Sequence, residues 1–163
     1  MKFYINNKLM SIGGSSEVLD ENNKKAYKVK GRAFSPTKVK KIFDMNGKFL
    51  YKVRNKFWRF VRNYVLIYDS SKKLIGKVTT EKVVGGSFVL QEYEEEIALT
   101  RINNGLEITS GEKQIAIMKY KMAMMTDKFE LEVLDENYKD LCIALVIAID
   151  NYRDRIVKDT TNH

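Results

Sequence analysis

The chain has 163 residues, a net charge of +8, a single cysteine (Cys142) and a single histidine (His163). This length suits one domain with a substantial core, and the lone cysteine excludes a disulfide within the chain. A Ser-His or Cys-His catalytic system is also excluded, because the only histidine is the last residue. The glycine pairs at residues 13–14 and 85–86 match no phosphate-binding loop. We therefore expect no catalytic residue, cofactor or metal.

The first ten residues, MKFYINNKLM, are largely polar and contain no continuous apolar stretch. A secretory signal peptide needs such a stretch of about 7–15 residues. The sequence therefore predicts a cytoplasmic protein, with a peripheral position at the inner face of the membrane as an extension of that expectation.

The N-terminal half contains three copies of one pattern, in which an aspartate is followed nine residues later by a valine. The pairs are Asp20 and Val29, Asp44 and Val53, and Asp69 and Val78. Polar turn segments follow each aspartate, whose carboxylate can accept hydrogen bonds from backbone N–H groups two or three residues on. Asn46-Gly47 predicts a type I′ turn, since both residue types tolerate positive φ. Each copy is thus predicted to form a strand, a tight turn and a second strand.

The second half continues with short apolar segments. Asn104-Gly105 separates two of them and is another hairpin signal. Residues 128–134 alternate apolar Phe129, Leu131 and Val133 with glutamates, which is the two-residue period of a half-buried strand. We expect ten to twelve strands joined by short turns, an arrangement typical of an antiparallel barrel or sandwich.

A helix is predicted in place of the second strand of the last hairpin. Residues 133–137 repeat residues 18–22 letter for letter, but a run without any polar residue then follows. The run is Leu141, Cys142, Ile143, Ala144, Leu145, Val146, Ile147, Ala148 and Ile149. A helix that is apolar all round must be buried all round, and this one is too short to span a bilayer. We expect Asp135 or Asn137 to cap it, one domain over residues 1–157, and a disordered tail over residues 158–163.

Taken together, the aspartate turns, Tyr27-Lys-Val-Lys-Gly31, Tyr51-Lys-Val53 and the closing apolar run resemble the LURP-one-related family over about residues 3–155. That family belongs with the tubby C-terminal-like domains and the phospholipid scramblases. The resemblance implies a closed antiparallel barrel of about twelve strands enclosing the C-terminal helix. It implies no agreed activity, although tubby domains bind phosphoinositides and scramblases are calcium-dependent and act at membranes. The chain lacks the cysteine-rich and proline-rich segments of scramblases, so lipid translocation is not expected.

The charge is unevenly distributed along the chain. Residues 1–85 carry 20 Lys and Arg against 6 Asp and Glu, a net of +14, whereas residues 86–163 carry 9 against 15, a net of −6. The candidate binding residues combine cations with one tryptophan: Lys28, Lys30, Arg32, Lys38, Lys40, Lys41, Lys52, Arg54, Lys56, Trp58, Arg59 and Arg62. Cations beside aromatic rings suit an anionic phospholipid surface, and they also suit single-stranded nucleic acid.

Two alternatives stay open for these charges. The aromatic residues can face the core while the cations form the solvated side of strands, and the two halves can simply attract each other. A scaffold that recognises another protein is a third functional hypothesis. The acidic group Glu92, Glu94, Glu95 and Glu96 offers oxygen ligands for calcium, but it lacks EF-hand spacing and also suits a solvated face. The sequence predicts no oligomeric state.

Overall fold

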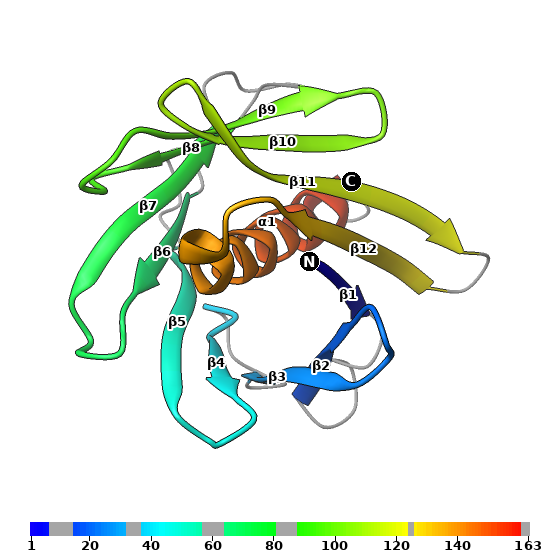
Figure 1. Cartoon of the computed structure of the whole chain (residues 1–163). Coiled ribbons are helices and arrows are strands. Elements are labelled where there is room, and N and C mark those ends of the chain that lie inside the picture. The colour runs from blue at the N-terminus through cyan, green and yellow to red at the C-terminus, as the bar shows by residue number, and fades with distance from the viewer. Residues whose placement is uncertain (7–14, 32–36, 57–63, 81–87, 124–125, 161–163) are drawn as a thin grey trace.

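The computed structural model describes residues 1–6, 15–31, 37–56, 64–80, 88–123 and 126–160. Within these ranges, twelve strands form a barrel around one long helix (Figure 1). The elements are β1 (Lys2–Asn6), β2 (Ser15–Asp20), β3 (Lys25–Gly31), β4 (Lys40–Asp44), β5 (Phe49–Lys56), β6 (Tyr64–Tyr68), β7 (Leu74–Thr80), β8 (Phe88–Gln91), β9 (Ile97–Ile102), β10 (Gly105–Ser110), β11 (Lys113–Ala123), β12 (Thr126–Val133), the 3₁₀ turn η2 (Glu136–Tyr138) and α1 (Lys139–Thr160).

Each strand pairs antiparallel with the next strand along the chain, and the first strand pairs with the last. In that closing pair, Phe3 of β1 lies opposite Leu131 of β12. Closure leaves the sheet without an open edge, which removes the unpaired backbone groups that an edge strand would expose. The predicted fold class, a closed antiparallel barrel enclosing a C-terminal helix, is confirmed.

The three aspartate turns share one geometry. One carboxylate oxygen of Asp20 accepts backbone N–H groups from Asn22 and Lys24, at 2.8 and 2.9 Å. Asp44 accepts the same pair of bonds two and four residues on, and Asp69 accepts the bond four residues on together with the hydroxyl of Ser71. The second bond therefore reaches one residue further than the sequence predicted. The carboxylate replaces partners that the turn's own backbone does not supply.

The predicted type I′ turn at Asn46-Gly47 is not formed. Only Gly47 of that pair has a positive φ, at +82°, and its N–H donates to the carbonyl of Asp44. The loop therefore has three residues, with the left-handed residue third, and Asn23 and Lys72 adopt the equivalent φ of 59° and 69°. This is a type I turn followed by a bulge, the usual solution for a three-residue hairpin loop. The aspartate side chain favours it, because it ties down the longer loop.

The apolar run lies inside the barrel as predicted. Residues 141–149 are each at most 4 % exposed, and they pack against the inward side chains of the strands. The repeated valines Val29, Val53 and Val78 are fully buried on the inner wall. Asp135 caps the short turn η2 by accepting the N–H of Asn137, and α1 follows directly. The helix continues to Thr160, and residues 161–163 lie outside the described residues.

The helix does not lie on the barrel axis. It packs most closely against β5, β6, β7 and β12. On the near side, a side chain added at Gly76 of β7 would meet Leu90 Cδ1 at 2.5 Å. On the far side, the corresponding residue of β3 is Tyr27, whose ring is buried. On β5, which the helix contacts most closely, the corresponding residue is Tyr51, so glycine at Gly76 is explained by the neighbouring Leu90 of β8 and not by the distance to the helix.

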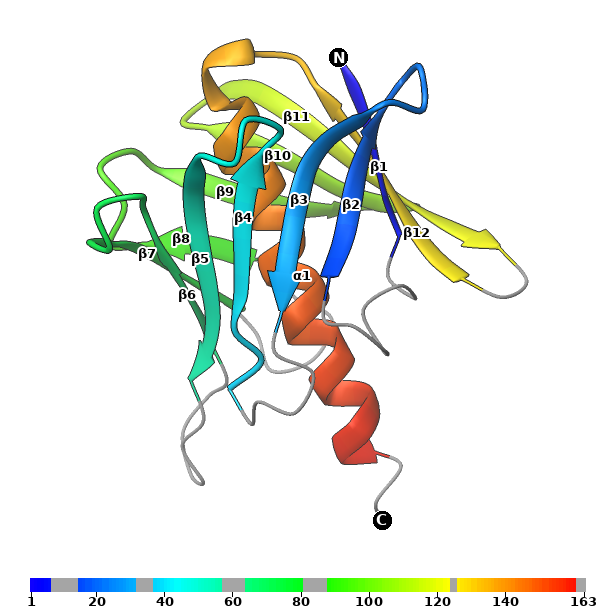
Figure 2. The ribbon, with the colours of Figure 1, turned by 90° about the horizontal axis from the view of Figure 1, so that it is seen from below.

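Two polar contacts hold the helix to the far wall. Tyr27 Oη donates to Asp140 Oδ1 at 2.6 Å, and Lys40 Nζ of β4 lies 2.6 Å from Asp150 Oδ2. Burial, followed by this hydrogen bond, raises the pKa of the Tyr27 phenol, so the phenol keeps its proton and remains a donor. The two aspartates flank the apolar run, and Figure 2 shows how the helix passes along the barrel from one end to the other. Among the described residues, no helix is long and apolar enough to cross a membrane.

Replacing Leu145 tests whether the helix fills the barrel. Leu145 is fully buried, so Leu145→Asp places a carboxylate in an apolar interior and should cost several kcal/mol, on the order of the stability of a whole domain. We expect a protein that is insoluble or lacks a cooperative thermal transition by circular dichroism. Leu134→Asp is the control, because Leu134 is 50 % exposed and should tolerate the change. A cooperatively melting Leu145→Asp protein would contradict this fold.

Candidate anion-binding surface

Six cations extend from the outer surface of three adjacent strands. Along β3, Tyr27 and Val29 point inward, so Lys28 and Lys30 point outward, and the same alternation applies to β4 and β5. We call the group the basic face; it consists of Lys28, Lys30, Lys41, Lys52, Arg54 and Lys56. Five of the six side chains are exposed, and Lys52 is half-buried. These strands lie side by side in Figure 2.

The pairing register places like charges directly opposite one another. Lys30 of β3 lies opposite Lys41 of β4, and Lys41 lies opposite Lys52 of β5. Side chains at opposed positions have Cβ atoms about 4.5–5.5 Å apart, and like charges there destabilise the sheet. We call Lys30, Lys41 and Lys52 the row. Repulsion between these three ammonium groups lowers the stability of the fold, and a bound anion would reduce that repulsion.

Aromatic rings lie among these cations. The ammonium of Lys52 is 3.9 Å from the ring centre of Tyr68, and that of Lys30 is 5.1 Å from the ring centre of Phe43. Lys56 and Lys77 both lie near the ring of Tyr64, at 5.7 and 5.2 Å. The rings attract the ammonium groups through their negative faces without cancelling their charge.

Few carboxylates lie near the basic face among the described residues: Glu17 of β2 lies opposite Lys28, and its carboxylate pairs with Lys25. In the described part of the chain, none of its six cations forms an ion pair, whereas lysines elsewhere do, such as Lys25 with Glu17 and Lys121 with Glu130. Strands β3, β5, β6 and β7 contain no acidic residue, and β4 contains only Asp44, whose carboxylate is bound within its turn. The face therefore carries a net positive charge.

Lys40 does not belong to this face, which corrects the predicted set. Its side chain is 7 % exposed and points into the barrel, where it pairs with Asp150. The alternation of the strand is the reason: Ile42 faces the core, and Lys40 lies two residues before it. Sequence alternation alone would have identified Lys40 as an inward residue.

Lys38 is half-buried and adopts a left-handed backbone conformation, with φ at 40°. Its carbonyl accepts the side-chain amide of Asn151 at 2.8 Å, and the amide of Asn55 donates to the carbonyl of Asn151 at 3.1 Å. These contacts make the backbone of Lys38 part of the structure that holds α1. Arg32, Trp58, Arg59 and Arg62 lie outside the described residues.

The sequence reasoning missed four neighbours of the basic face: Phe43, Tyr64, Tyr68 and Lys77. The signal was present in residues 64–68, where alternation buries Val65 and Ile67 and turns both tyrosines outward. The cross-strand register that brings Tyr68 opposite Lys52 was not readable, because it depends on the loop between β5 and β6.

Comparison with known proteins identifies the family. The sequence model of the LURP-one-related family matches residues 1–150. The chain belongs to the LURP-one-related family. The chain is also 22 % identical over 152 residues to a Bacillus subtilis (strain 168) protein described as uncharacterized protein YxjI, with 92 % of both chains aligned. No solved structure matches the chain. The fold agrees with the expectation from the resemblance, while a ligand does not follow from family membership.

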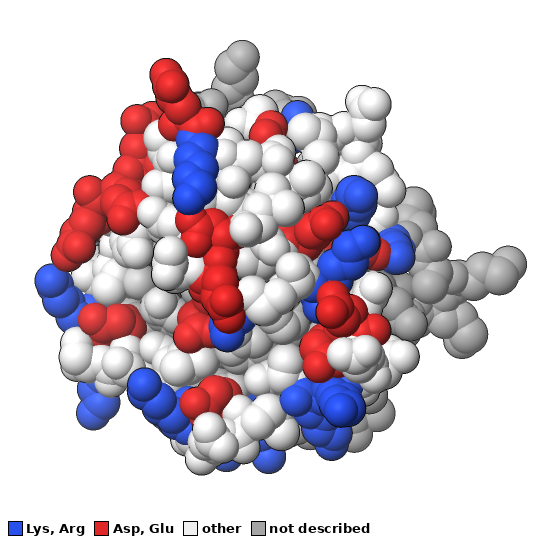
Figure 3. All heavy atoms as spheres, in the orientation of Figure 1, with Lys and Arg blue, Asp and Glu red and all other residues white. Residues whose placement is uncertain are grey.

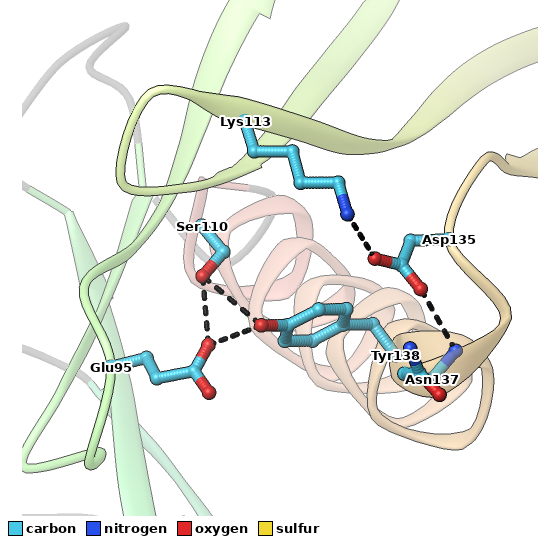
Figure 4. Close-up of polar contacts among 6 residues, drawn as sticks. All are labelled: Glu95, Ser110, Lys113, Asp135, Asn137 and Tyr138. Atoms are coloured by element: carbon cyan, nitrogen blue, oxygen red, sulfur yellow. Dashed lines mark hydrogen bonds and ion pairs between the residues drawn. The ribbon is translucent and has the colours of Figure 1, made fainter.

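The acidic segment of this LURP-one-related chain, Glu92–Glu96, has a structural role. Figure 3 shows acidic side chains along the edge of the barrel end where β8 and β9 connect. Glu95 accepts hydrogen bonds from the hydroxyls of Tyr138 and Ser110 (Figure 4). Within the described ranges, no three acidic, histidine or cysteine side chains come together as metal ligands. Glu95 instead ties the β8–β9 connection to the turn before α1.

A pair of neighbouring lysines tests the inward and outward assignments. Lys40→Met removes an ammonium that stabilises the buried carboxylate of Asp150, and we expect a loss on the order of 3 kcal/mol in unfolding free energy. Lys41→Met is the matched control and should cost nothing, since it removes repulsion from the lysines opposite it. Urea unfolding measures both. Equal losses in the two variants would contradict the placement of Lys40.

The contact between Glu95 and Tyr138 predicts a pH effect. Hydrogen bonds from Tyr138 and then Ser110 hold the pKa of Glu95 below its ordinary 4.5. A carboxylate with a lower pKa in the folded state stabilises the fold above its ordinary pKa, and this contribution disappears as the pH falls through the folded value. Tyr138→Phe should raise the pKa of Glu95 toward 4.5 in an NMR titration, whereas Tyr4→Phe should not move it. An unchanged midpoint in Tyr138→Phe would contradict the contact.

Proposed function

We propose that this protein is a non-enzymatic module that binds anionic phospholipid surfaces through the basic face. The observation that supports the proposal is the row Lys30, Lys41 and Lys52, whose like charges oppose one another across three strands without a carboxylate partner. A sheet that only needed a solvated outer surface would be more stable with opposite charges at these positions.

The geometry suits a surface better than a pocket. The cations lie on the convex outside of a barrel, and strands of five to eight residues carry them at spacings fixed by the pleat. Each cation near an anionic membrane contributes about 1 kcal/mol. The five exposed cations would then give about 5 kcal/mol, which corresponds to a Kd of roughly 0.2 mM and to reversible, peripheral attachment.

Single-stranded nucleic acid is the alternative, supported by the partly exposed rings of Tyr64 and Tyr68 on the same side. In the structure, however, lysine ammonium groups lie near both rings, and a stacking base would have to displace them. This arrangement favours the phospholipid surface.

Charge reversal of the row tests the proposal. Lys30→Glu, Lys41→Glu and Lys52→Glu combined should abolish binding to mixed phosphatidylserine–phosphatidylcholine vesicles in a flotation assay. Binding of the unchanged protein should weaken from 0.1 M to 1 M salt, as the Debye length falls from about 10 Å to about 3 Å. The control combines Lys24→Glu, Lys119→Glu and Lys139→Glu, which changes the net charge equally but lies outside the basic face.

The outcomes separate the hypotheses. Binding by the control but not by the reversed row supports the proposal, and equal losses would reduce it to an effect of net charge. Equal binding to pure phosphatidylcholine vesicles, or failure to bind any vesicle at low salt, would refute it. Displacement from vesicles by a single-stranded oligonucleotide of matched charge, at lower concentration than soluble phosphatidylserine headgroup analogues, would favour the nucleic-acid alternative.

A further inference from the structure

Exposed apolar side chains occupy the tips of the two hairpins that border the basic face. Met45, in the turn between β4 and β5, is 52 % exposed, and Leu74, at the start of β7, is 37 % exposed. Phe43 and Phe49 face each other across the β4–β5 pair, with ring centres 5.6 Å apart. Tyr68 lies opposite Leu74. We call these five residues, Phe43, Met45, Phe49, Tyr68 and Leu74, the apolar rim.

The bulge in each hairpin explains why these side chains point outward. After the turn, Leu50 and Ile75 are the extra residues and pack toward the core, whereas Phe49 and Leu74 pair with the outward residues of the preceding strand. The rim is thus a product of the repeated turn geometry and does not consist of core residues that have become exposed.

The first hairpin of the repeat serves as an internal comparison. Its turn has the same hydrogen bonds, but the position of Met45 is Glu21 and the position of Phe49 is Lys25. Lys25 pairs with Glu17 and the tip is polar. Turn geometry therefore does not require an apolar residue at the position of Phe49, which is Leu74 in the β6–β7 hairpin; the position of Met45 is Ser70 there, and the position of Phe43 is apolar Leu19 in the first hairpin.

Cations surround the rim directly. Lys28 lies opposite Phe43, and Lys52 lies opposite Tyr68 with its ammonium near the ring. Asp44 and Asp69 are the acids of the two turns, and Lys48, Lys72 and Lys73 in the same turns offset their charge. Apolar and aromatic side chains bordered by cations suit the boundary between lipid headgroups and acyl chains.

We propose that the apolar rim inserts into the headgroup region of an anionic bilayer while the basic face lies against its surface. This inference rests on the proposed function and adds the orientation and depth of binding. The bilayer then contacts the tips of the β4–β5 and β6–β7 hairpins, which lie at the same end of the barrel in Figures 1 and 2. Insertion adds a contribution that salt does not screen, because it comes from burial of apolar area.

A fluorescent label tests the depth. Cys142 is fully buried, and burial raises the pKa of its thiol to about 12, so it will not compete for a thiol reagent. Met45→Cys and Leu134→Cys are then labelled with an environment-sensitive nitrobenzoxadiazole dye. The two positions are similarly exposed, at 52 % and 50 %, but Leu134 follows β12, which β1 and β2 separate from β3 of the basic face.

We expect a blue shift and increased emission at position 45 on addition of phosphatidylserine–phosphatidylcholine vesicles, with quenching by a headgroup-attached nitroxide. Position 134 should show neither change. In unlabelled protein, Met45→Ser with Phe49→Ser should weaken vesicle binding at least tenfold at equal salt. Leu134→Ser, the control, should bind as the unchanged protein does.

The results distinguish this inference from the proposed function. Salt-dependent vesicle binding with both dyes remaining in water would overturn the inference and leave the proposed function standing. Absence of vesicle binding in every variant would overturn both. A blue shift at position 45 that grows with protein concentration without vesicles would overturn the inference by showing contact between copies of the chain.

Discussion

The constraint on which the structure depends is that a closed sheet of twelve strands encloses a space that its own side chains do not fill. The apolar helix occupies that space, and residues 141–149 form one hydrophobic cluster with the inward side chains of the strands. Because residues 141–149 are apolar on all sides, the helix can face any wall favourably. Polar contacts are then needed to fix its position, and Tyr27 and Lys40 supply them from β3 and β4, which are not among the strands that the helix contacts most closely.

In β3 and β4, neighbouring residues of one strand have different roles, one inside the barrel and one on its outer surface. In β4, Lys40 holds the helix inside while Lys41, one residue later, belongs to the outer basic face. In β3, Tyr27 and Lys28 divide in the same way. The two-residue period of a strand therefore places the contacts that fix the fold directly behind the residues proposed to bind anions. Mutations at adjacent positions should consequently affect different properties of the protein.

The sequence predicted the barrel and the enclosed helix because both depend on strong local patterns, the repeated aspartate turns and an apolar run without a charge. The sequence-based prediction was wrong where the preference of a single residue or residue pair competes with interactions made by other residues. Asn46-Gly47 alone favours a two-residue turn, but Asp44 has two backbone N–H groups to bind and stabilises a three-residue loop. Lys40 was placed outside because it is charged, although its alternation with Ile42 places it inside, where Asp150 compensates its burial.

The position of the helix after the twelve strands has a consequence for synthesis. Strand β1 finds its partner only in β12, and the interior is filled only when residues 139–160 have been made. Contacts so distant in sequence are slow to form, because the loop between them must close first. Until these residues have been made, the inner face of each hairpin remains exposed to solvent. Its apolar side chains can then contact other unfolded chains. The barrel can therefore close around its helix only after residues 139–160 have been made.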